Sequence, residues 1–270
     1  CNVATGWTSV AINVVDSAGT KSTIAASTGN KILDVMKLSN ATNETTGAVA
    51  GLDFESVWKV TEVMPILKSF AGKVIAPDIT WYNDSDTYVL YNAADLYGFA
   101  SLVNDGNHFA GKTVKLGNDI VVNEGIASEW ATTAPKHTWT PIGSKTNYFA
   151  GVFDGDMHTI SGLYFDTTAQ YTGLFGGIKT SGDTQATVQN LKLKNSHLTS
   201  TQTALGSIVG QGRGLIDTVY SEAIVTSSTA QVGGFIGLAY GNKVTLKNCW
   251  FAGYVKNTGT AAKNRGTGGL

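Results

Sequence analysis

A short phrase recurs three times in the second half of the chain and constrains the fold more than any other feature. It occurs as Gly173-Leu174-Phe175-Gly176, Ser207-Ile208-Val209-Gly210 and Gly234-Phe235-Ile236-Gly237. The closing glycines, Gly176, Gly210 and Gly237, are 34 and 27 residues apart. After a polar gap, each copy is followed by an alternating run, at 188–193, 216–221 and 246–251. Repeats of this length in strand-forming sequence indicate stacked units, none of which can bury its apolar face alone.

The repeat also determines how the strands pair. Equivalent runs return only after a full turn of chain, so hairpins cannot join them and neighbouring strands must be parallel. Within one run, Leu191 and Leu193 share a side, as the two-residue period of a strand requires. We therefore predict an all-β chain folded as a parallel β-helix, or β-solenoid. Matched outward positions then form two columns, one of Gln189, Asp217 and Lys247 and one of Lys192, Tyr220 and Trp250.

The composition excludes several classes of protein. A formal net charge of −1 and only two arginines, Arg213 and Arg265, argue against a nucleic-acid partner. No apolar run approaches the roughly 18 residues that a membrane span needs. Two cysteines, Cys1 and Cys249, are too few for a disulfide scaffold. Cys249 is expected to be a small buried hydrophobe, and Cys1 suits either a lipidated lipoprotein terminus or an internal cysteine at a cut end.

A helix is predicted upstream of the regular coils. Asn92 can cap a helix over Ala93 to Asn104, with Asp95 in the first turn and Gly106 past the end. Its apolar face comprises Leu96, Phe99, Ala100 and Val103. Such a helix beside a solenoid would cover an open end with unpaired backbone. We therefore divide the chain into a terminal segment at 1–72, a strand plus capping helix at 73–110, and β-helix coils at 111–270. A protruding loop is expected at 124–138.

The order of these pieces resembles the GLUG-motif family of bacterial surface and secreted repeat proteins. The resemblance covers about residues 87–270, through Ala93-Ala94-Asp95-Leu96, Phe109 to Leu116, Trp139 to Gly143, Phe149 to Gly155, Thr159 to Leu163 and the first repeat phrase. It implies a right-handed parallel β-helix at a bacterial cell surface. Leu52 to Phe70 resembles a family element that normally follows the last coil, whereas 266–270 resembles a truncated repeat phrase. This order suits either an excised fragment or a subunit completed head to tail by a neighbour.

Few residues suggest chemistry. Asp154, Asp156 and His158 alternate as strand-face residues should and could bind a metal, although a turn at Asp154-Gly155 accounts for most of that pattern. Asp84 and Asp86 lack the rest of a calcium loop. Tyr220 and Trp250 take the same offset in neighbouring coils and could form a flat outward platform for a sugar ring or a partner surface, unless loops or a neighbouring subunit bury them. Arg213 is expected at a corner, and no cofactor is implied.

These observations favour a noncatalytic, extracellular or surface-anchored β-helix with a structural or adhesive role, in a cell-surface protein or a head-to-tail fibre. Self-association or contact with neighbouring repeats is expected, and a carbohydrate or host surface is a candidate ligand. The main alternative is a carbohydrate-binding or carbohydrate-cleaving β-helix. Cleavage would need carboxylates clustered at matched positions, whereas the matched columns are mixed. A stalk for a catalytic domain outside these residues is a further alternative.

Overall fold

The computed structural model describes residues 9–15, 21–27, 58–59, 66–67, 75–182, 184–259 and 266–268. The chain divides into two compact units, Cys1–Lys73 and Val74–Leu270. In the first unit, β1 (Ser9–Val15) pairs antiparallel with β2 (Lys21–Ser27), and β3 (Trp58–Lys59) pairs antiparallel with β4 (Ile66–Leu67). The sequence predictions for Cys1 lie outside the described residues.

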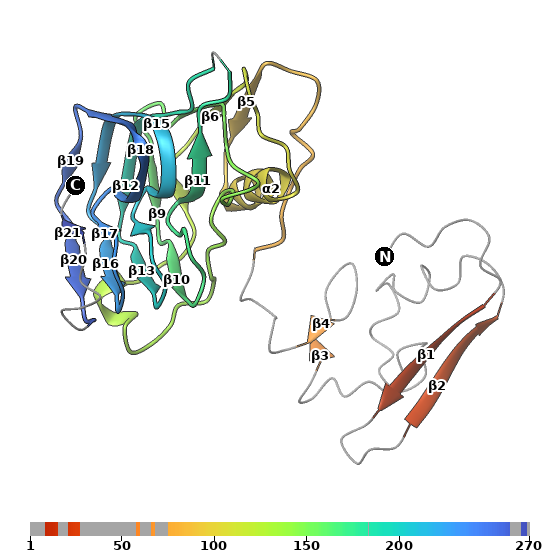
Figure 1. Ribbon diagram of the computed structural model, residues 1–270. Helices are drawn as coiled ribbons and strands as arrows, with labels where there is room; N and C mark the ends of the chain where they lie inside the picture. Colours follow the sequence, from red (N-terminus) through yellow and green to blue (C-terminus); the bar gives the residue numbers. More distant parts are fainter. Residues whose placement is uncertain are drawn as a thin grey trace. The chain divides into compact units, whose positions relative to one another are not determined.

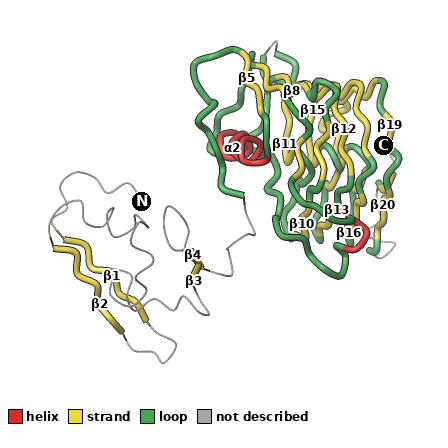
Figure 2. Tube along the Cα trace, turned by 180° about the vertical axis from the view of Figure 1, so that it is seen from behind, coloured by secondary structure: helices red, strands yellow, loops and turns green. Residues whose placement is uncertain are grey.

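The second unit is a parallel β-solenoid of about 6 turns, as the repeat predicts (Figures 1 and 2). Its largest sheet has ten strands, and two further sheets have four and three strands. The large sheet contains β5 (Thr87–Leu90), β6 (Thr113–Leu116), β7 (Ile120–Val121), β8 (Val152–Asp154), β9 (Thr159–Ser161), β11 (Phe175–Lys179), β12 (Thr187–Lys194), β15 (Val209–Ser221), β18 (Ile236–Lys247) and β19 (Trp250–Phe251). The four-stranded sheet contains β10 (Tyr164–Thr167), β13 (His197–Ser200), β16 (Ile224–Ser227) and β20 (Tyr254–Asn257). The three-stranded sheet contains β14 (Leu205–Gly206), β17 (Val232–Gly233) and β21 (Thr267–Gly268).

The repeat phrases occupy equivalent places in successive coils. Phe175 pairs with Val209, and Val209 pairs with Ile236. The preceding residues, Leu174, Ile208 and Phe235, are fully buried. The closing glycines are required by close approach of neighbouring backbone, since a Cβ on Gly176 would lie 2.2 Å from the carbonyl oxygen of Gly143. Cβ atoms on Gly210 and Gly237 would lie 2.3 Å and 2.4 Å from backbone atoms of Thr172 and Ala204.

The alternating runs bend at their third residue. Asn190, Thr218 and Asn248 all have left-handed backbone, with φ of 53°, 56° and 52°. The bend explains why Val188 and Leu191, three residues apart, are both buried: a straight strand would send them to opposite faces. Asparagine tolerates this conformation better than most residues, which accounts for its recurrence at the corner. The two predicted columns follow the registers, with Gln189 beside Asp217 beside Lys247, and Lys192 beside Tyr220 beside Trp250.

The capping helix is confirmed with its predicted bounds as α2 (Ala93–Asn104). Asn92 Oδ1 accepts from the Asp95 N–H at 3.0 Å, and Asp95 Oδ2 accepts from the Tyr91 N–H at 2.8 Å, so the two side chains satisfy backbone donors at the helix start. Leu96, Phe99 and Val103 are fully buried. The ring of Phe99 contacts the rings of Phe109, Phe149, Phe153 and Phe175. α2 therefore closes the end of the solenoid at which β5 is the edge strand (Figure 2).

Two features differ from the sequence prediction: the place of the strand before the helix, and the conformation of the segment 124–138. The strand placed with the cap, β5, pairs with β6 and is itself the first strand of the large sheet. The segment 124–138 does not simply protrude: it contains a short 3-10 helix, η2 (Ala127–Glu129), and the side chain of Trp130 is 6% exposed and meets Tyr164 edge to face. Burial of the Trp130 ring holds this otherwise polar segment against the solenoid. Within the described residues, no helix has the length and apolar character of a membrane span.

Replacing Phe99 by Ala tests the cap. The substitution removes a fully buried ring from a cluster of four other phenylalanines, so the free energy of unfolding should fall by about 3–5 kcal/mol. Urea denaturation followed by circular dichroism would measure the change. Ser101→Ala, on the same helix but only half-buried, should change stability by less than about 0.5 kcal/mol. Equal effects of both variants would contradict the capping role.

Candidate functional site

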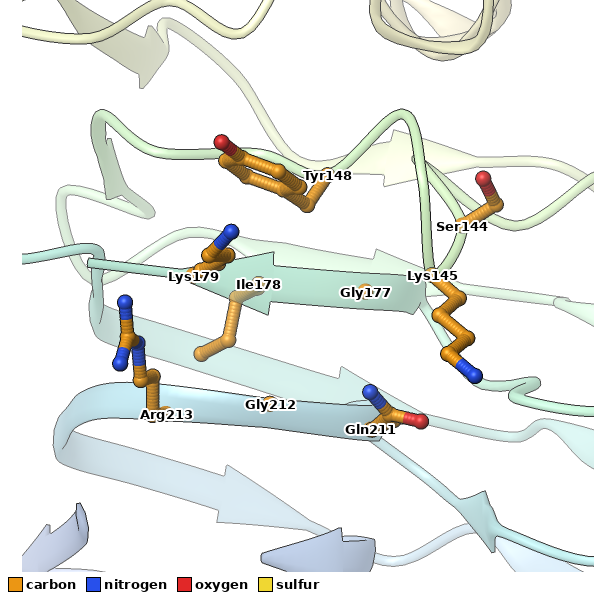
Figure 3. Close-up of a pocket in the computed structure, with 9 residues that line it drawn as sticks. All are labelled: Ser144, Lys145, Tyr148, Gly177, Ile178, Lys179, Gln211, Gly212 and Arg213. Carbon is orange, nitrogen blue, oxygen red and sulfur yellow. The ribbon is translucent and has the colours of Figure 1, made fainter. Parts of the chain in front are cut away.

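A hollow of about 350 Å³ lies on the outer surface of the large sheet, beside β11 and β15 (Figure 3). Its wall comes from the segment 144–148, and its floor from Gly177, Gly212 and the mostly buried Ile178. The residues that surround the opening are Ser144, Lys145, Tyr148, Lys179, Gln211 and Arg213. None of these six is acidic.

The wall is positioned by the capping helix. Asn104, the last residue of α2, accepts from the Gly143 N–H through its Oδ1 at 2.9 Å, and its carbonyl oxygen accepts from the side-chain amide of Asn147. The ends of the segment are fixed to β11, because Ile142 forms a bridge with Phe175 and Phe149 forms one with Ile178. The cap therefore stabilises the solenoid end and also orients one side of the hollow.

Tyr148 holds a cation beside the hollow. Its ring stacks on that of His108 with centroids 4.3 Å apart, and its carbonyl oxygen lies 2.7 Å from His108 Nδ1. The Nζ atom of Lys179 lies 4.5 Å from the centroid of the Tyr148 ring. A cation at this distance is attracted by the ring quadrupole. The contact keeps the ammonium group of Lys179 near the opening.

Arg213 occupies an unusual point of the coil stack. It pairs with Lys179 in β11, yet Leu215 pairs with Thr187, so the seven residues 180–186 lie opposite Gly214 alone. On the other side, Gly212 pairs with Ala239 and Gly214 with Val244, so the four residues 240–243 lie opposite Arg213 alone. Both neighbouring coils thus contain more residues than β15 at this point. The corner expected at Arg213 stays a prediction: β15 runs from Val209 to Ser221, with a register shift between Gly212 and Gly214.

The predicted aromatic pair is present but is not a flat platform. Tyr220 and Trp250 are neighbours in register with ring centroids 6.3 Å apart, and their planes meet at 76°. Trp250 is 71% exposed, so no described residue buries it. The Tyr220 hydroxyl donates to Glu222 Oε2 at 2.9 Å. The perpendicular arrangement is the edge-to-face geometry that aromatic rings prefer over a face-to-face sandwich.

The three residues considered as metal ligands are not brought together. Asp156 and Met157 have φ of 47° and 67°, so the chain turns after β8 and the three side chains do not alternate along one strand face. Asp154 Oδ1 accepts from the Asp156 N–H at 2.9 Å, whereas His158 Nδ1 lies 3.2 Å from Asp119 Oδ1. In the part of the chain that the structure describes, no group of three His, Cys, Asp or Glu side chains could hold a metal ion. The turn at Asp154-Gly155 accounts for these residues.

Sequence reasoning missed the hollow. Its residues come from three segments, 144–148, 177–179 and 211–213, which become neighbours only through the register of β11 and β15. A signal was nevertheless present, because Lys179 and Arg213 each follow a glycine-containing strand start after a repeat phrase. Aligning the phrases would place the two cations side by side. Cys249, predicted to face inward, is partly buried, and burial raises the pKa of its thiol.

Comparison with known proteins gives two partial likenesses. The chain is 30% identical over 165 residues to Halomucin of Haloquadratum walsbyi, which covers 60% of this chain and 2% of that protein. It is 28% identical over 138 residues to a putative Gly-rich membrane protein of Evansella cellulosilytica, covering 50% of this chain and 14% of that protein. The chain thus spans only a small part of both relatives. No family model and no solved structure matches it.

Asp154 links three coils through charge and hydrogen bonds. Its Oδ2 accepts from Gln189 Nε2 and its Oδ1 from Asn190 Nδ2, both at 3.0 Å. Burial alone raises the pKa of this carboxyl, but the bonds from the Asp156 N–H, Asn190 and Gln189 and the charge of Lys115 lower the pKa by more. The carboxylate therefore stabilises the fold above the unfolded-state pKa of about 3.9, and this contribution is lost as pH falls through the lower folded-state pKa.

The variant Asp154→Asn should lower the free energy of unfolding at pH 7 by about 1–3 kcal/mol, since amide donors of Gln189 and Asn190 lose a charged acceptor. It should also flatten the decline of stability below about pH 4. Urea denaturation at a series of pH values would measure both effects. The exposed Asp166→Asn variant is the control. A pH profile unchanged in Asp154→Asn would refute the assignment.

Proposed function

We propose that this chain is a noncatalytic structural and adhesive β-solenoid of the GLUG-motif type, working at a cell surface or outside the cell. The proposal rests on one observation: apolar side chains are buried at one end of the solenoid and only partly buried at the other. α2 covers the β5 end, where the apolar side chains are buried. At the other end, the inward side chains of Val244, Leu246, Phe251 and Val255 are only partly buried. A further coil would complete their burial.

The strand register shows the same difference between the last coil and the coil before it. Leu246 pairs with Ile216 and Val255 pairs with Val225, and both partners are fully buried. Each coil buries its inward residues against the coils on both sides, so the coil of β18 to β21 has one such neighbour among the described residues. Its edge also presents backbone groups that pair readily with another strand. We propose that another parallel coil, from a neighbouring repeat or a second copy of the chain, occupies this end.

The relatives support a surface location. One is named a halomucin and the other a Gly-rich membrane protein. The chain matches a small part of each, which suits a repeat array inside a larger surface protein.

The noncatalytic part of the proposal is supported by the matched outward column. Lys115, Asp154, Gln189, Asp217 and Lys247 follow one another across the coils. The two carboxylates are separated by the strand of Gln189, and each is engaged: Asp154 with Gln189 and Asn190, and Asp217 with Asn248 and Lys247. A carbohydrate-cleaving site needs a facing pair of carboxylates. Carbohydrate binding without cleavage remains a second candidate, favoured by the cationic hollow.

Replacing Leu246 by Asp tests the open end. The full chain should associate in sedimentation velocity, and Leu246→Asp should shift it towards a 28.3 kDa monomer, because a buried carboxylate would oppose coil stacking. Thr245→Asp adds the same charge at the adjacent exposed position and should leave association unchanged. Circular dichroism would verify that both variants keep their strands. A monomeric unmodified chain would contradict this proposal.

A further inference from the structure

We propose that the hollow beside β11 and β15 binds an anionic polysaccharide through the carboxylate or sulfate groups of its sugars. The proposal gives the adhesive role a class of ligand. It rests on the proposed function only for the polymeric, extracellular nature of that ligand. The hollow itself, its charges and its hydrogen-bonding groups belong to the described structure.

The first argument is unbalanced charge. Lys145, Lys179 and Arg213 surround the hollow, and among the described residues no carboxylate lies within ion-pair distance of any of them. Two other outward lysines do have a carboxylate partner: Lys112 Nζ lies 2.7 Å from Asp86, and Lys247 Nζ lies 3.3 Å from Asp217. Three cations gathered without an acid create a local positive potential that attracts an anion.

The second argument is the state of Arg213. Its Nη2 donates to the Thr180 carbonyl oxygen at 3.1 Å, whereas its Nε is buried and has no hydrogen-bond partner among the described residues. A buried donor without an acceptor is costly. A small shift of the side chain towards a bound oxyanion would give Nε an acceptor in the fork geometry that guanidinium groups use for carboxylate and sulfate.

The third argument concerns the rest of the ligand. The floor is uncharged and is formed mainly by Gly177 and Gly212, since Ile178 is only 2% exposed. The rim carries the amide of Gln211 and the hydroxyl of Ser144, which accepts from the Asn147 N–H at 3.0 Å and lies 3.3 Å from Thr146 Oγ1. An apolar floor suits the C–H face of a sugar ring, and a few polar groups at the rim suit its hydroxyls. These features favour a saccharide over a peptide.

The fourth argument is spacing. Lys179 and Arg213 lie at one side of the hollow, and Lys145 lies at the opposite side (Figure 3). Tyr148 fixes Lys179 through the cation–ring contact at 4.5 Å. Two separated positive positions match a chain with acidic groups on successive sugars better than a single isolated anion. We therefore assign the site to a polymer in which charge repeats along the chain.

The test uses the full 270-residue chain and isothermal titration calorimetry with four probes. Tetragalacturonate presents carboxylates, a heparin tetrasaccharide presents sulfates, maltotetraose is an uncharged saccharide and tetraglutamate is an acidic peptide. We expect one or both anionic saccharides to bind, and the one that binds identifies the oxyanion. Binding should weaken as salt rises.

Two double variants locate the binding. Lys145→Gln with Lys179→Gln removes two cations from the hollow, and Lys136→Gln with Lys256→Gln removes two exposed lysines elsewhere. The net charge changes equally in both. The hollow variant should bind roughly tenfold to hundredfold more weakly, and the control should bind as the unmodified chain does. Lysine acetylation read by mass spectrometry should show Lys145 and Lys179 protected by the bound saccharide.

Several outcomes would overturn the proposal: no binding of either anionic saccharide, equal binding of maltotetraose, binding of tetraglutamate as tight as that of the saccharides, or equal losses in the two double variants. Failure here is distinguishable from failure of the proposed function. Self-association through Leu246 is measured without any saccharide, and saccharide binding is measured at a surface formed by β11 and β15.

Discussion

The structure depends on the parallel hydrogen-bonded register between successive coils. Because Val188, Ile216 and Leu246 follow one another in that register, each inward side chain is buried by equivalents in the coils beside it. Burial therefore comes from stacking rather than from a closed core within one coil. The glycines that close the repeat phrases maintain this arrangement, since their missing side chains let neighbouring backbones approach. A solenoid of this kind has no intrinsic end, so each end needs its own physical solution.

At the β5 end the solution is local in sequence. Asn92 and Asp95 satisfy donors at the start of α2, and the apolar face of the helix places Phe99 among phenylalanines from several coils. The last residue of the same helix, Asn104, hydrogen-bonds through its side chain and its carbonyl oxygen to the segment that forms a wall of the hollow. One element thus closes the apolar section of the solenoid and shapes its outer surface.

Sequence reasoning succeeded where information is local or periodic. The capping signals of Asn92 and Gly106 gave the bounds of α2, and the spacing of the runs placed Tyr220 beside Trp250. It failed where the outcome depends on torsion angles or on the number of residues per coil. Left-handed backbone at Asp156 and Met157 turns the chain and separates Asp154 from His158. The sequence pattern could not predict the orientation of the two rings either, since aromatic residues at the same offset in neighbouring coils can stack or meet edge to face.

The hollow shows why differences in the number of residues per coil affect mainly the outer surface of the solenoid. Inward positions are fixed on both sides by neighbouring coils, so extra residues can be accommodated only by extending outward. The coils on both sides of Arg213 contain such extra residues, since Lys179 pairs with Arg213 but Thr187 with Leu215, and Gly212 with Ala239 but Gly214 with Val244. The carbonyl oxygen of Thr180 accepts from Arg213 Nη2 at 3.1 Å, and Gly177 and Gly212 lie at the adjacent floor of the hollow. The regular strands β11 and β15 supply the floor of the hollow, and the segment 144–148 supplies its wall. Recognition can thus vary without any change to the inward columns on which stability depends.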